Sequence, residues 1–157
     1  MNLAPLLVGS LALIFNMLIQ IAVIVVVLHY LLRYVDKGPL TPALGTDIRV
    51  MSIVFLALFF GHVLQFALWA WLFMYLGEFN DFDTAFYHSV VNFTSLGYGD
   101  IVMSEKWRLL GGLEAANGIL MFGLSAGSFL PLMLRMFGRH ASIAQARIKV
   151  SGKGDIE

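Results

Sequence analysis

The chain has 157 residues, of which 59% are hydrophobic and only 13% are charged, and its mean hydropathy is +0.83. Water-soluble domains carry about 25% charged residues, so this composition excludes an ordinary soluble protein and predicts an integral membrane protein. The formal net charge is zero and there are no cysteines, which excludes disulfide frameworks and cysteine-based metal sites.

The first apolar run extends from about Pro5 to Leu32, which is long enough to cross a bilayer as a helix. We therefore assign residues 1–34 to an N-terminal transmembrane helix. A cleaved signal peptide is the competing interpretation, but it would need a basic start and a short apolar core. The first basic residue of this chain is Arg33, so we expect the helix to be retained.

The remaining segments follow in a clear order. Residues 35–47 contain two prolines and two glycines and are expected to form a linker. Residues 48–76 predict a second spanning helix. Residues 82–93 are too short to span and predict a re-entrant helix, which enters the membrane and stops. Residues 107–137 predict a third spanning helix, and residues 138–157 are left as a short polar tail.

The placement of basic residues predicts the orientation. Eight of the ten basic residues flank the linker or follow the third span, namely Arg33, Lys37, Arg49, Arg135, Arg139, Arg147, Lys149 and Lys153. Loops rich in Lys and Arg stay in the cytoplasm, so we expect a multi-pass protein of the plasma membrane with its N-terminus outside and its C-terminus inside. The basic tail is expected to meet anionic lipid headgroups, and no nucleic-acid partner is expected.

Residues 93–100 read Phe-Thr-Ser-Leu-Gly-Tyr-Gly-Asp, a sequence unsuited to the helices on either side of it. Non-helical backbone at membrane depth is tolerated only where it is buried in protein or lines water. Gly97 and Gly99 reach positive φ without steric cost, so the backbone can alternate in handedness and turn consecutive carbonyls toward one axis. Rings of such carbonyls can replace the hydration shell of a potassium ion. The alternative is an ordinary glycine-rich turn.

The segment TSLGYGD (residues 94–100) resembles the potassium-channel signature Thr-x-x-Gly-Tyr/Phe-Gly-Asp. The order of outer helix (48–76), pore helix (82–93), filter (94–99) and inner helix (107–137) is similar to the pore module of that family. The resemblance implies an all-α membrane protein, a homotetramer in which each chain contributes three transmembrane helices, a re-entrant pore helix and a filter loop. Its expected activity is passive, potassium-selective conduction.

The resemblance also implies which residues touch the permeant K⁺, with no organic cofactor. The coordinating carbonyls would be those of Thr94, Ser95, Leu96, Gly97 and Tyr98. The Thr94 hydroxyl would close the innermost site, and Tyr98 would face outward and brace the filter against neighbouring helices. Gly99 and Asp100 would shape the outer mouth.

Three features depart from the family pattern. Ser95 and Leu96 stand where Thr and Val or Ile are commoner, a mild change because only backbone oxygens face the ion there. Val91 occupies a position where some bacterial channels carry a glutamate, so inactivation tied to that carboxylate is not implied. The extra helix at residues 1–34 has no repeated arginines and does not resemble a voltage sensor.

Glu114 lies about two turns into the third span, at a depth where ionisable side chains are costly and often functional. It could support the pore or draw cations near the base of the filter. Alternatively, it lies near the outer interface and is hydrogen-bonded to the pore helix or to Arg108. We favour a structural role.

The third span also carries small residues and a proline. Gly118 is a candidate hinge, and Pro131 removes a helix hydrogen bond and can kink the helix. Gly123 and Gly127 have the spacing of a close helix–helix contact. The candidate constrictions, which would close the pore by dewetting, are Phe129, Leu132 and Phe137.

Polar residues within the apolar runs are expected to form hydrogen bonds between helices. Asn16 and Gln20 share one face of the first helix, and His62 and Gln65 lie one turn apart in the second. An ion site is the alternative for these four. His88 in the re-entrant helix could sense pH, but we expect a neutral packing residue with one hydrogen bond.

Two other functions stay open beside a potassium-selective channel. One is a weakly selective cation channel, because selectivity depends on fine filter geometry. The other is a non-conducting subunit that acts through its extra helix. We do not expect an enzyme, because no nucleophile–base pair or metal-ligand cluster is visible in the sequence.

Overall fold

The computed structural model describes residues 3–37 and 44–154, and within these ranges the chain forms four helices and no strand. The helices are α1 (Ala4–Lys37), α2 (Leu44–Tyr75), α3 (Phe82–Phe93) and α4 (Leu109–Gly154). Within the described residues, α1, α2 and α4 are long and apolar enough to cross a membrane. The predicted all-α fold with three spanning helices is therefore confirmed, while residues 38–43 of the predicted linker lie outside the described residues.

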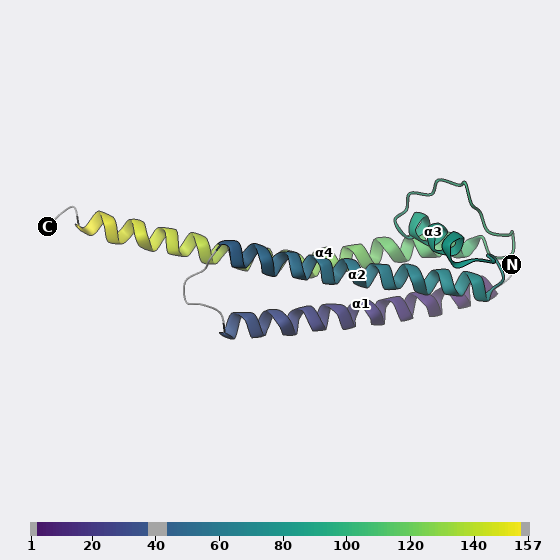
Figure 1. Cartoon of the computed structure of the whole chain (residues 1–157), viewed down its shortest axis with the longest axis horizontal. Coiled ribbons are helices and arrows are strands. Elements are labelled where there is room, and N and C mark those ends of the chain that lie inside the picture. The colour runs from purple at the N-terminus through teal and green to yellow at the C-terminus, as the bar shows by residue number, and fades with distance from the viewer. Residues whose placement is uncertain (1–2, 38–43, 155–157) are drawn as a thin grey trace.

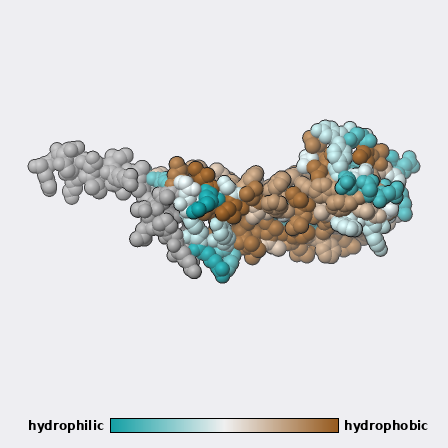
Figure 2. All heavy atoms as spheres, viewed as in Figure 1, coloured by the Kyte–Doolittle hydropathy of each residue, from teal (hydrophilic) through white to brown (hydrophobic). Residues whose placement is uncertain are grey.

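The three long helices lie side by side, and α3 with the loop that follows it sits at one end of the bundle (Figure 1). We call this end the loop end, and the opposite end, where α4 projects past its neighbours, the tail end. In the space-filling view, hydrophobic residues cover the middle of the visible face and hydrophilic residues gather toward both ends (Figure 2). This distribution suits an integral membrane protein.

Local capping explains why α3 occupies twelve residues. The side chain of Asp81 accepts a hydrogen bond of 2.8 Å from the backbone N–H of Thr84, which is the usual way to start a helix. This bond favours the carboxylate and lowers the pKa of Asp81 below its ordinary value. The helix ends because Thr94 is the last residue in the right-handed helical region and Ser95 turns to a φ of +61°.

α4 is longer than its apolar run. It begins at Leu109 rather than at residue 107, and it continues through Pro131 to Gly154, so most of the polar segment after residue 137 is helical. Ala, Gln, Arg and Lys are good helix formers, and the sequence HASIAQARIK is rich in them. α2 likewise begins at Leu44, ahead of its predicted start at residue 48.

Two apolar clusters hold the bundle together. The one nearer the loop end is built mainly from aromatic side chains, with Trp69, Phe73 and Phe93 fully buried. The one nearer the tail end joins Leu31 of α1 to the α2 residues Val50, Val54 and Leu58. Both clusters place α1 against its own chain's α2 and α4.

Candidate functional site

Residues 94–100, which we call the signature loop, follow α3 directly. Ser95, Gly97 and Gly99 have φ angles of +61°, +59° and +74°, so every second residue lies in the left-handed region. Where handedness alternates along a chain, successive N–H groups gather on one side, and such an arrangement would turn the carbonyl oxygens to the other side.

Hydrogen bonds fix the direction in which these N–H groups point. The N–H of Ser95 donates to the Asn92 carbonyl at 2.8 Å, and the N–H groups of Leu96 and Gly97 both donate to the Val91 carbonyl at 3.0 and 3.3 Å. The last turn of α3 therefore binds the amides of the first three residues after Thr94.

Ser95 is the one described non-glycine residue with positive φ. A side chain in that conformation costs about 1–2 kcal/mol, and strained backbone of this kind clusters at functional sites. Serine disfavours positive φ, so the sequence predicts left-handed backbone only at Gly97 and Gly99. The two glycines are two residues apart, and extending this spacing by one step toward α3 leads to Ser95 as the third residue with positive φ.

Thr94 belongs to the helix rather than to the alternation. Its φ and ψ of −79° and −2° are helical, and its hydroxyl donates back to the Val90 carbonyl at 2.7 Å. That hydroxyl is therefore directed at the turn of α3, which does not suit the expected role of the Thr94 hydroxyl in closing a site. The next hydroxyl along the chain is that of Ser95, where the alternation begins.

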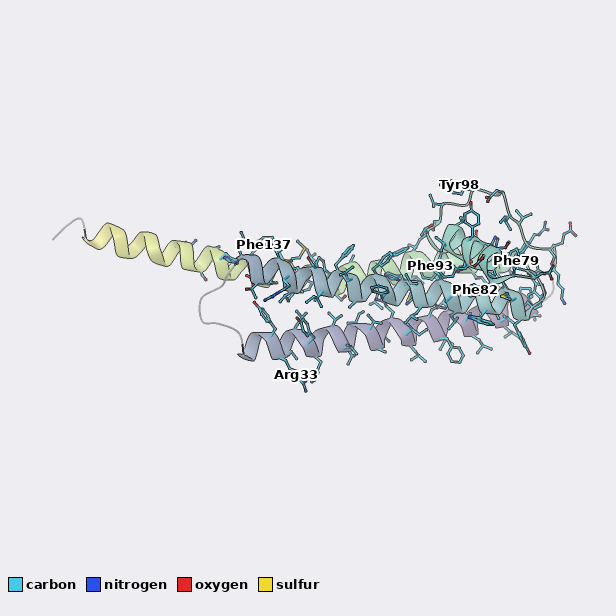
Figure 3. The ribbon with its side chains drawn as sticks, in the orientation of Figure 1. Arg33, Phe79, Phe82, Phe93, Tyr98 and Phe137 are labelled. Atoms are coloured by element: carbon cyan, nitrogen blue, oxygen red, sulfur yellow. The ribbon has the colours of Figure 1, made fainter. Side chains whose placement is uncertain are left out.

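The signature loop lies on the side of the bundle away from α1 (Figures 1 and 3), and Tyr98 is labelled on it. Residues 95–100 are all exposed in the single chain, with Tyr98 retaining 67% of its surface. At the end of the loop, Asp100 accepts a hydrogen bond of 2.8 Å from the Tyr87 hydroxyl. This bond raises the pKa of Tyr87 and ties the end of the loop to α3.

Glu114 is fully buried within the chain, behind α3. The Ser89 hydroxyl lies 2.5 Å from Glu114 Oε1 and 2.9 Å from the Phe66 carbonyl, so it can donate to either. Of the two interpretations of Glu114, the contact with α3 is observed, and the partners are the side chains of Ser89 and Asn92 rather than Arg108. One serine thus joins α2, α3 and α4 behind the signature loop.

The small residues of α4 differ in what surrounds them. A Cβ atom at Gly118 would overlap the carbonyl oxygen of Phe93 and lie 2.8 Å from its carbonyl carbon, whereas a Cβ atom at Gly123 or Gly127 would meet nothing within 4 Å. Close packing inside the chain therefore occurs at Gly118, the predicted hinge, and not at the predicted Gly123–Gly127 pair.

The candidate constrictions face different surroundings. Phe129 and Leu132 pack against the tail-end cluster of α1 and α2, while Phe137 remains 58% exposed and is labelled toward the tail end (Figure 3). Pro131 is exposed within a continuous helix. A constriction formed by Phe129 or Leu132 would require these side chains to leave their contacts within the chain.

The polar residues of α1 and α2 form one closed ring of hydrogen bonds with Ser125 of α4. Gln20 Nε2 donates to Ser125 Oγ at 2.7 Å, and that hydroxyl lies 3.0 Å from His62 Nε2. His62 Nδ1 lies 3.2 Å from Gln65 Oε1, and Gln65 Nε2 donates to Gln20 Oε1 at 2.9 Å. The predicted interhelical bonds are confirmed for these residues, but the Asn16 side chain donates to Ala12 within α1.

A protein-family model described as "Ion channel" matches residues 53–135. The match covers just over half of the chain and includes α3, the signature loop and the apolar parts of α2 and α4, but not α1. Comparisons with curated proteins and with solved structures gave no significant match.

Proposed function

Because the chain belongs to the ion channel family, we propose that it is a potassium-selective channel in which four copies surround one pore. The observation that carries the proposal is the alternating backbone at Ser95, Gly97 and Gly99 in a segment whose first amides, those of Ser95, Leu96 and Gly97, are bound by α3. Potassium filters use backbone carbonyls in place of the ion's hydration shell, and this loop has carbonyls to offer.

Each level of such a filter needs several oxygens around the ion, and one chain supplies a single carbonyl per level. Four loops around an axis would supply stacked rings of oxygens from residues 94–98, with K⁺ passing from one level to the next. The C-terminal end of α3, the negative end of its dipole, would add a favourable field. In this proposal the exposed face of the loop is the ion pathway, and Ser95 provides the innermost hydroxyl.

Contacts behind the loop would keep this backbone in place. Glu114, held by Ser89, and Gly118, packed on the Phe93 carbonyl, both position α3 from α4. The bond between Tyr87 and Asp100 positions the outer mouth. The loop end would face the extracellular side, with the N-terminus outside, the C-terminus in the cytoplasm and the basic tail on anionic lipids of the plasma membrane.

The direct test is a flux assay on the purified full chain in liposomes under a potassium gradient. We expect potassium flux that barium blocks and that fails when sodium replaces potassium. Absence of flux from an intact tetramer would favour the non-conducting subunit, and equal sodium and potassium flux would favour the weakly selective cation channel.

Gly97→Ala tests the role of the loop backbone. Its φ of +59° costs a residue with a Cβ about 1–2 kcal/mol, so we expect the potassium-to-sodium flux ratio to fall about tenfold. Gly77→Ala is the matched control, because Gly77 has a φ of +77° with nothing within 4 Å of its Cβ position and lies outside the loop. The carbonyl assignment would be wrong if both variants kept the wild-type ratio.

A further inference from the structure

His88 of α3 is only 5% exposed, and each of its two ring nitrogens has a polar partner within the chain. Its Nδ1 lies 3.1 Å from the carbonyl oxygen of Ile101, and its Nε2 lies 2.8 Å from Nδ2 of Asn92. The ring packs against Phe73 and Phe79, with centroid distances of 5.5 and 4.9 Å. The imidazole is thus held by two polar contacts and two aromatic neighbours.

The partners determine the protonation state. A carbonyl oxygen only accepts hydrogen bonds, so Nδ1 must carry a hydrogen. The Asn92 amide donates to Nε2, which must then carry none. If the Asn92 amide were turned over, its Oδ1 would face Nε2 and would call for a second hydrogen. The observed orientation of Asn92, whose side chain also bonds to Glu114, therefore suits the neutral form of His88, and turning the amide over would disturb that second bond.

The two partners stand at opposite ends of the signature loop. Asn92 lies in the last turn of α3, two residues before the loop begins, and its backbone carbonyl accepts a hydrogen bond from the N–H of Ser95. Ile101 is the first residue after the loop. His88 also shares with Gly97 and Gly99 the lining of a cavity of about 230 Å³ behind the loop. A single imidazole therefore bridges the start and the end of the loop from behind.

We propose that His88 is a positioning residue of the ion pathway: in its neutral form it ties the two ends of the signature loop together and so fixes the backbone that would coordinate K⁺. This inference rests on the proposed channel function. Protonation puts a second N–H against the Asn92 amide, so that two donors face each other and the tie at the start of the loop is lost.

The groups around His88 determine the pH at which its ring becomes protonated. The hydrogen bond to the Ile101 carbonyl and the carboxylates of Asp100 and Glu78 favour the protonated ring, and the cationic Arg108 lines the same cavity. On α4 the carboxyl near this site is that of Glu114, which is bound to the side chains of both Ser89 and Asn92. Burial is the largest influence and lowers the pKa of His88 below its ordinary value despite the two carboxylates.

The sign of the pH dependence follows from this direction. Folded His88 binds a proton less readily than unfolded His88, so its contribution to stability is complete above the ordinary histidine pKa of about 6.5. That contribution is lost as the pH falls toward the lowered pKa of the folded state. We therefore expect acid on the loop side of the membrane to reduce the potassium-to-sodium flux ratio, with the ratio intact at neutral pH.

Three variants of the full chain in liposomes separate this role from simple packing. His88→Leu removes both bonds and should lower the flux ratio severalfold at neutral and acidic pH alike. His88→Gln offers an NH₂ group as donor and one carbonyl as acceptor but cannot titrate, so it should keep the ratio and lose the acid response. Asn92→Asp supplies an acceptor for the protonated ring and should keep the ratio in acid. His29→Gln, at an exposed position on α1, is the control that should leave the acid response unchanged.

A second readout does not depend on conduction. Nitrogen-15 NMR of the imidazoles, with His88 assigned from the missing signal in His88→Gln, should show the Nδ1–H neutral form at neutral pH. The other neutral tautomer, or a charged ring at neutral pH, would overturn the proposal even if the protein conducts. A wild-type ratio and acid response in His88→Leu would also overturn it. If no protein conducts, the proposed function fails and the NMR result alone decides for or against the tie.

Discussion

Gly118 of α4 shows how closely a single residue limits the packing at the base of the signature loop. A Cβ atom there would overlap the carbonyl of Phe93, the residue that ends α3 just before the signature loop. A hydrogen atom is therefore the largest group that lets α4 approach the base of the loop at this point. A glycine that the sequence marks as a hinge is, in the folded chain, a point of contact.

Gly118→Ala should destabilise the protein, because overpacking typically costs about 1–3 kcal/mol and the clashing group here is backbone. The matched control is Gly138→Ala in the same helix, where nothing lies within 4 Å of the Cβ position. Both changes carry the same gain in helix propensity. In detergent, the midpoint of thermal unfolding should fall several degrees below that of the unchanged protein for Gly118→Ala but not for Gly138→Ala. Equal midpoints for the two variants would refute the contact.

The sequence predicts part of this residue-scale geometry. It predicts left-handed backbone at Gly97 and Gly99, because only glycine reaches that region without steric cost. It does not predict Ser95, whose type argues against positive φ, or the contact of Gly118, which depends on how α3 and α4 pack. It also does not show that His88 has partners at both ends of the loop, because Ile101 contributes only its backbone carbonyl.

At the scale of helices, α1 is attached to α2 and α4 by the ring of Gln20, Gln65, His62 and Ser125. Each donor in the ring faces one acceptor if His62 carries its hydrogen on Nδ1 and Ser125 donates to Nε2. The ring therefore closes, while Gln65 Nε2 also donates to the Asn16 carbonyl and Ser125 Oγ also lies 3.0 Å from the Met121 carbonyl. Because Ser125 lies on α4, two turns past Gly118, the ring couples the extra helix to the helix that packs on the signature loop.

Ser125→Ala should weaken this attachment, because it leaves Gln20 Nε2 and His62 Nε2 without their partner. Hydrogen bonds between membrane helices contribute about 0.6 kcal/mol on average and up to about 1.7 kcal/mol, so two broken bonds should cost about 1–2 kcal/mol. Ser128→Ala is the control, because Ser128 donates only to the Ser125 carbonyl within α4. The free energy of unfolding in mixed micelles should be measured for both variants. An equal loss of stability in the two would exclude a special role of the ring.

Helix boundaries were predictable where local signals exist. Asp81 and the short apolar run after it indicate α3 correctly, because an N-cap and a left-handed residue determine its two ends. The extension of α4 to Gly154 was not predicted, because a polar sequence without apolar periodicity looks like a tail even when its residues favour helix. Polar residues one turn apart in α1 and α2 predicted interhelical bonds, but the third partner, Ser125, is an ordinary serine in the sequence.

For the whole molecule, α1 contacts its own chain along its length. Near the loop end, Gly9 packs on Leu110 and Leu113, and the hydrogen-bonded ring lies further along. At the tail end, the Tyr34 hydroxyl and His140 both contact the Asp47 carboxylate, at 3.2 and 2.7 Å. No sequence pattern distinguishes this arrangement from exchange of α1 onto a neighbouring subunit, because the same contacts would be satisfied in either case.

A cross-link between α1 and α4 decides between these arrangements. The Cβ position at Gly9 lies 3.5 Å from Leu113 Cβ, which is within the range of disulfides, and the chain has no cysteines of its own. Oxidation of the Gly9→Cys, Leu113→Cys double variant in membranes should give a single-chain band on a denaturing gel, unchanged in mass by reductant. The single variants are the controls and should form no bond. A ladder of linked chains that collapses on reduction would show instead that α1 is exchanged, so that the ring and the tail-end contacts would join neighbouring subunits rather than hold one chain together.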